Sequence, residues 1–65
     1  MAPLILVPAY GRRYSEEWAL LEDWENGLDF KIEGGPMCSI RDLPSMKRQF
    51  GNVSIRMKQG YYINV

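Results

Sequence analysis

The chain has no histidine and only one cysteine, Cys38, among its 65 residues. The missing histidine removes the commonest general base and the commonest metal ligand, and a lone cysteine cannot form a disulfide within the chain. No other set of residues spells out a reaction, so we expect a protein that is not an enzyme and that holds neither a cofactor nor a metal. Small secreted domains of this length usually depend on several disulfides. The single cysteine therefore indicates a reducing compartment, and we expect a cytoplasmic protein.

Long hydrophobic runs are also missing. The opening segment Met1–Pro8 has no basic residue, and its apolar run is far shorter than the ~18 residues that a membrane span needs. We expect neither a signal peptide nor a membrane anchor. Cys38 has no His or Lys next to it that would lower its pKa, and Met37 and Ile40 give it apolar neighbours, so it is interpreted as an unreactive filler.

The length and composition predict one small globular domain that spans residues 1–65. A chain of this size buries only about 60% of the surface that its unfolded form exposes, so its stability is marginal. Hydrophobic residues make up 46% of the chain and the net charge is zero, whereas disordered chains combine few apolar residues with a large net charge. Without disulfides or a metal, a partner protein or a second copy of the chain could cover part of its apolar surface.

Charges of opposite sign are separated along the sequence. Residues 15–33 contain seven acids and one base, a balance of −6, and residues 34–65 contain five bases and one acid, a balance of +4. If the fold keeps these segments apart, the molecule is an electric dipole. The alternative is that the two segments form solvated faces that differ only in sign.

The first half of the chain predicts a strand, a helix and a second strand. The apolar run 4–7 is typical of a strand that is buried on both faces at the centre of a sheet, and Pro8 ends its regular pairing. A helix is expected over 15–26, with Ser15 as its N-cap and Gly27 in the left-handed position after its end. Its inward side is predicted to carry Leu20, Leu21 and Trp24, with Trp18 at the edge. The alternation in 29–33 indicates a half-buried strand, with Phe30 and Ile32 inward.

The second half predicts a short helix and a hairpin. Residues 34–36, Gly-Gly-Pro, form a break, and residues 39–42 resemble a capping box with Asp in place of Glu. Proline is favourable at the first position of a helix, so the second helix is expected to begin near Leu43 or Pro44 and to end at Phe50 before Gly51. Alternation in 53–58, a turn at 59–60 and the run 61–65 then predict a C-terminal β-hairpin.

The resulting order, β-α-β-α-β-β, predicts an α+β fold with a small single-layer mixed sheet, both helices on one face and a C-terminal β-hairpin. The first two strands are joined through a helix, so we expect them to run parallel as paired or nearly paired strands, with a right-handed crossover, and the C-terminal hairpin to be antiparallel.

A candidate binding segment lies where the first strand leads to the first helix. Ligands in open α/β sheets bind at the carboxyl ends of strands, and Tyr, Arg and Trp are the types enriched among energetic hot spots of protein interfaces. The predicted partner-binding residues are Tyr10, Arg12, Arg13, Tyr14 and Trp18. The bland alternative is that the two tyrosine rings pack over the sheet edge while the arginines are solvated.

A nucleic-acid site is the alternative interpretation. Bases beside an aromatic ring on a sheet face are how several small folds hold single-stranded nucleic acid. The residues that would serve are Arg12, Arg13, Arg56, Lys58 and Tyr62. The zero net charge counts against it, because nucleic-acid-binding domains are usually strongly basic, and a solvated face is the other alternative. The acids of the first helix are interpreted as a solvated face, since catalytic carboxylates need burial and unequal environments.

Three parts of the sequence share an order of residues with a known group of proteins. They are Leu-Val-Pro-Ala-Tyr-Gly-Arg in 6–12 followed by Tyr14, then Asp23-Trp24 with Gly27 and Asp29-Phe30, and then Val-Ser-Ile-Arg in 53–56. In this order the chain resembles a group of small bacteriophage and prophage proteins of unassigned activity. The resemblance spans most of the chain. It departs from the group at Arg13, where an acid is usual, and across 37–46. It implies a phage accessory protein in the cytoplasm of a bacterial host. Together with the missing catalytic chemistry, it leads us to expect a protein that binds, and thereby inhibits or recruits, a host or phage protein; a homodimer is a further option.

Overall fold

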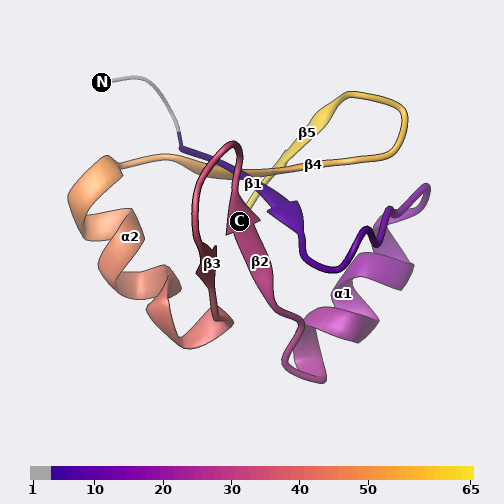
Figure 1. Cartoon of the computed structure of the whole chain (residues 1–65). Helices are drawn as coiled ribbons and strands as arrows, with labels where there is room; N and C mark the ends of the chain where they lie inside the picture. Colours follow the sequence, from indigo (N-terminus) through magenta and orange to yellow (C-terminus); the bar gives the residue numbers. More distant parts are fainter. Residues whose placement is uncertain (1–3) are drawn as a thin grey trace.

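A computed structural model describes residues 4–65 as a five-stranded mixed sheet with two helices packed against it (Figure 1). The strand order is β3-β2-β1-β4-β5. The elements are β1 (Leu4–Pro8), α1 (Glu17–Glu25), β2 (Phe30–Ile32), β3 (Met37–Cys38), the 3-10 turn η1 (Ile40–Asp42), α2 (Leu43–Phe50), β4 (Val53–Arg56) and β5 (Tyr62–Asn64). The predicted α+β class is confirmed. Residues 1–3 of the opening segment lie outside the described residues.

β1 is the central strand, as predicted, but its pairing with β2 differs from the prediction. β1 runs antiparallel to β2, with Leu6 opposite Ile32, and parallel to β4, with Leu6 opposite Ile55. The N–H of Ala9 donates to the carbonyl of Asp29 (3.0 Å), so the chain leaves β1 and enters β2 at the same end of the sheet. The first helix is therefore part of an excursion at one end of the sheet, and the parallel crossover lies between β1 and β4.

Both helices cover one face of the sheet, as predicted, and the core lies between them and the strands (Figure 1). Leu20 of α1 and Met46 of α2 pack into the same cluster as Leu6 and Ile55 of the central strands. Register places the alternate residues of the strands on the outer face, which no helix covers. The prediction that β1 is buried on both faces is consequently wrong, because Ile5 and Val7 on this outer face are only partly buried.

Helix α1 is shorter than predicted and is rotated slightly about its axis. Its N-cap is Glu16, which has extended backbone and no side-chain capping bond, and not Ser15. Leu20 is buried, but Leu21, which was expected on the inward side, is 54% exposed. Trp24 is only partly buried, and its ring lies at a tilt 5.0 Å from that of Phe30. The side of α1 that faces the core is therefore narrower than the sequence pattern indicates, with Leu20 as its buried residue.

The end of α1 agrees with the prediction. Gly27 has a φ of +86°, its N–H donates to the carbonyl of Trp24, and the N–H of Leu28 donates to the carbonyl of Asp23. These are the two bonds of a Schellman motif, in which a glycine without a Cβ takes the left-handed position. Leu28 is buried in the core. The motif turns the chain sharply, so that Asp29 lies beside the end of β1.

Strand β3 was missed by the sequence analysis. After the turn at 33–36, the N–H of Ile32 donates to the carbonyl of Pro36 (3.1 Å), and Lys31 pairs with Met37. A strand of two residues is too short to show an alternating pattern. The break at 34–36 was recognised, but the hairpin that it closes was not.

The second half of the chain otherwise follows its local signals. The capping box of Ser39 and Asp42 is present at η1, Pro44 lies in the first turn of α2, and Gly51 ends that helix with a φ of +82°. β4 and β5 form the predicted antiparallel hairpin, although β4 ends at Arg56 and the turn is wider than the two residues expected. No helix within residues 4–65 is both long enough and apolar enough to cross a membrane.

Candidate functional site

The loop that follows β1 begins with a strained turn. The N–H of Arg12 donates to the carbonyl of Ala9 (3.3 Å), and both residues between them have positive φ, 62° at Tyr10 and 72° at Gly11. Glycine adopts such backbone freely, whereas a residue with a Cβ pays roughly 1–2 kcal/mol. The turn holds the Tyr10 side chain 72% exposed at the end of the sheet. Bulky side chains in this conformation are uncommon, and they gather at functional sites.

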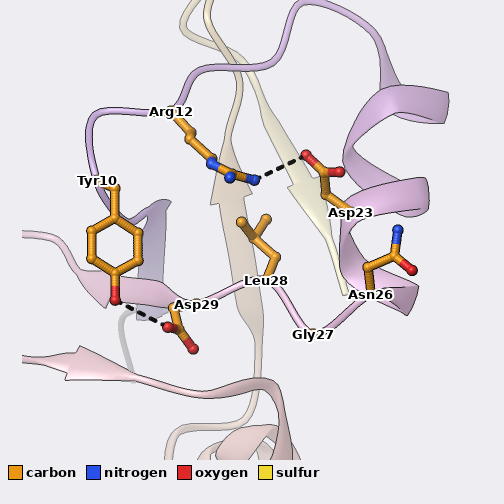
Figure 2. A pocket seen from close by; sticks show the side chains of 7 residues that line it. All are labelled: Tyr10, Arg12, Asp23, Asn26, Gly27, Leu28 and Asp29. Carbon is orange, nitrogen blue, oxygen red and sulfur yellow. Dashed lines mark hydrogen bonds and ion pairs between the residues drawn. The ribbon is translucent and has the colours of Figure 1, made fainter.

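This loop and the end of α1 enclose a first hollow of about 320 Å³ (Figure 2). The hollow is lined by Tyr10, Arg12, Asp23, Asn26, Gly27, Leu28 and Asp29. In Figure 2, Tyr10 and Arg12 on the loop face carboxylates on the opposite side. The Tyr10 hydroxyl donates to Asp29 Oδ2 (3.2 Å), and Arg12 Nη1 lies 3.5 Å from Asp23 Oδ2. The hydrogen bond to Asp29, and then the charge of Asp29, raise the pKa of Tyr10.

Tyr14 belongs to the core and not to the exposed surface where the sequence analysis placed it. Its side chain is 7% exposed, and its hydroxyl donates to Asp23 Oδ2 at 2.5 Å. The pKa of Tyr14 is raised, first by the burial of its side chain and second by the hydrogen bond to Asp23. For Tyr14 the alternative interpretation, in which its ring packs against the fold, is therefore the correct one. Its role at the site is to fix the Asp23 carboxylate that also meets Arg12.

A second hollow, of about 60 Å³, lies on the other side of the same loop. It is lined by Val7, Pro8, Arg12, Arg13, Arg56, Met57 and Lys58. β1 and β4 are parallel neighbours, so their carboxyl ends lie together at this point. The N–H of Lys58 donates to the carbonyl of Tyr14 (2.8 Å), and Gln59 Nε2 donates to the carbonyl of Ser15 (3.0 Å). These bonds fasten the loop to the chain beyond β4.

The second hollow brings together four of the five residues that were named for a nucleic-acid site: Arg12, Arg13, Arg56 and Lys58. The fifth, Tyr62, contacts Arg56. Arg56 pairs across the hairpin with Tyr62, and its guanidinium carbon lies 5.6 Å from the centre of that ring. Arg56 Nη2 also meets Glu33 Oε2 at 2.7 Å. Hydrogen bonding to Tyr62, and then the charge of Glu33, raise the pKa of Arg56. Its guanidinium is thus tied to the outer face of the sheet.

Trp18 lines neither hollow. It is 64% exposed at the start of α1, and its indole N–H donates to the carboxylate of Glu16. Leu21, one turn further, shares its side of the helix because residues three apart are neighbours on a helix surface. The predicted partner-binding residues therefore separate: Tyr10 lies at the first hollow, Arg12 at both hollows, Arg13 at the second, Tyr14 in the core and Trp18 on α1.

The described residues also define what the site can do chemically. No three His, Cys, Asp or Glu side chains within residues 4–65 are grouped so that they could hold a metal ion. Burial, with the Asp42 charge adding to it, raises the pKa of the Cys38 thiol, which agrees with an unreactive filler. The two hollows offer a ligand hydrogen-bonding groups, charges and exposed apolar side chains.

Five lining residues of the first hollow, Asp23 and the four in 26–29, were not among the predicted site residues, and the exposed Leu21 was not either. The Schellman signal at Gly27 was visible in the sequence, and it could have indicated that Asp29 returns to the loop after β1. The exposure of Leu21 had no such signal. Comparison of the chain with protein-family models, with curated proteins and with solved structures finds no match in any of the three.

Proposed function

We propose that the chain is a non-enzymatic accessory protein of the bacteriophage type, which binds a protein of the host or of the phage in the bacterial cytoplasm. The observation that carries this proposal is the exposure of large apolar side chains beside the first hollow and on α1. Tyr10, Trp18 and Leu21 are 72%, 64% and 54% exposed, although the chain has a well-formed core. Exposed aromatic side chains with arginine nearby are typical of energetic hot spots.

The charges around these side chains favour a basic partner surface. Trp18 and Leu21 share α1 with the exposed acids Glu17, Glu22 and Glu25. The first hollow adds the carboxylates of Asp23 and Asp29 against one guanidinium. Complementary charge steers association and disfavours partners of the same sign. The proposed contact surface is therefore the outer side of α1 together with the first hollow, and the partner presents lysine or arginine around an apolar patch.

Affinity capture from a bacterial lysate with matched variants tests the proposal. We expect the parent chain to retain a partner in stoichiometric amount, and Trp18→Ala and Tyr10→Ala each to weaken retention about tenfold or more. Both side chains are exposed, so the thermal midpoint should hardly change. Tyr61→Ala is the control, because Tyr61 is an exposed aromatic residue in the turn between β4 and β5.

Two results would contradict the proposal. The first is that the parent retains nothing beyond a matrix without bait. The second is that Tyr61→Ala weakens retention as much as Trp18→Ala, since the contact would then not lie on α1. If the parent retains only a second copy of the chain, the surface mediates self-association and the proposal of a different partner protein is wrong.

A further inference from the structure

The second hollow gathers positive charge from distant parts of the sequence. Arg12 and Arg13 come from the loop after β1, and Arg56 and Lys58 come from the end of β4 and the residues that follow it. Arg13 Nη2 lies 3.5 Å from the carbonyl of Lys58, so the loop arginine reaches across to the other side. Four cationic residues around one small space repel one another unless an anion lies between them.

Two of these four cations have an acidic partner and two do not. Arg12 is close to Asp23, and Arg56 is close to Glu33. Among the residues that the structure describes, neither Arg13 nor Lys58 forms an ion pair. The hollow therefore has about two positive charges that a ligand could neutralise.

The dimensions of the hollow indicate the size of the anion. At about 60 Å³ it is much smaller than the first hollow of about 320 Å³. A single phosphate group is an anion of a size that suits so small a space. The planar fork of Arg13 and the ammonium of Lys58 are both good donors to phosphate oxygens.

An aromatic ring is linked to this small space through one arginine. Arg56 lines the hollow, and its guanidinium contacts the ring of Tyr62, which is not itself a lining residue. Tyr62 is 50% exposed on the outer face of the sheet, which neither helix covers. A base that stacks on an aromatic ring while its phosphate meets cations is the usual arrangement for single-stranded nucleic acids.

We propose that the second hollow binds a backbone phosphate of a single-stranded nucleic acid, with Arg13 and Lys58 as the phosphate ligands and Tyr62 as the stacking platform for the adjacent base. This site is distinct from the surface on α1. A phosphopeptide would use the same cations but would have no base to place on Tyr62. Binding is local and weak, because the chain as a whole has no net charge.

Titration of a fluorescently labelled single-stranded hexanucleotide by anisotropy tests the phosphate ligands. Neutralising one phosphate of a single strand gives a slope of log K against log salt of about −0.7, or roughly a 2.6-fold loss of affinity from 50 to 200 mM salt. Arg13→Gln and Lys58→Gln should each weaken binding and make this slope shallower, because the two side chains share the one phosphate. The matched controls Arg48→Gln and Lys47→Gln remove the same charges from α2, which contributes no residue to the lining of the hollow, and should leave both quantities unchanged.

The stacking platform is tested with Tyr62→Leu, which keeps an apolar side chain on β5. This variant should weaken hexanucleotide binding about fivefold or more and leave competition by inorganic phosphate unchanged. Circular dichroism checks that each variant is folded. Equal losses in the α2 controls, no binding of the hexanucleotide at 50 mM salt, or tighter binding of a phosphoserine peptide that is insensitive to Tyr62→Leu would each overturn the proposal.

Discussion

Removal of one hydroxyl group, in Tyr14→Phe, is expected to destabilise the fold although the aromatic ring remains. Tyr14 is buried, and its hydroxyl donates to Asp23 Oδ2 at 2.5 Å. A hydrogen bond to a charged acceptor contributes about 1.5–3 kcal/mol. The Asp23 side chain is 35% exposed and keeps Arg12 and water as partners, so its carboxylate is not stranded. We therefore expect the lower end of this range, about 1.5 kcal/mol.

Thermal unfolding followed by circular dichroism measures this loss. In a domain of this size 1 kcal/mol shifts the midpoint by about 4–8 °C, so Tyr14→Phe should lower it by roughly 6–12 °C. Tyr10→Phe is the matched control, because it removes the same atom from another aspartate partner, Asp29, at an exposed side chain. Its midpoint should remain close to that of the parent. If Tyr14→Phe melts with the parent, or if both variants lose the same amount, the assignment of Tyr14 to the core network is refuted.

Three further predictions concern stability. Trp24→Ala should cost about 2 kcal/mol in denaturant unfolding, less than the 3–5 of a fully buried aromatic, because Trp24 is only partly buried against Phe30; no loss would rule out that contact. Gly27→Ala should lower the free energy of unfolding by roughly 1–2 kcal/mol, since its φ is +86°, and an unchanged midpoint would contradict the left-handed cap. The folded-state pKa of Tyr14 is raised above its ordinary 10.0, so its contribution is present below that pH and is lost as the pH rises through the folded value. The stability of the parent should thus fall more steeply above about pH 10 than that of Tyr14→Phe, and parallel pH profiles would argue against the raised pKa.

The elements that could be predicted from the sequence are those whose signals are local. The second helix was found because Ser39, Asp42, Pro44 and Gly51 each act within a turn of where they stand. The hairpin of β4 and β5 was found for the same reason. β3 was not found, and β1 and β2 were given the wrong relative direction, because both depend on how distant segments meet. A strand-helix-strand segment has the same sequence pattern whether the second strand returns antiparallel at the same end of the sheet or crosses over to run parallel to the first.

The candidate site shows the same division. Tyr10 and Tyr14 flank the same two arginines, and no local pattern distinguishes them, yet Tyr10 is 72% exposed and Tyr14 is in the core. The bases Arg13 and Lys58 could be named from the sequence as cationic. Their meeting at one hollow depends on the parallel pairing of β1 with β4, which only the tertiary structure provides.

That parallel pairing also has a consequence for the speed of folding. Leu4 pairs with Val53, so the central strand obtains one of its two neighbours only when nearly the whole chain has been brought back to its start. Closing so large a loop loses entropy before any contact is gained, and folds rich in such contacts fold slowly. The hairpin of β4 and β5 and the pair of β1 and β2 can form earlier from nearer residues. We therefore expect the slow step of folding to be the docking of these two halves, and the cationic hollow between β1 and β4 to form only with that step.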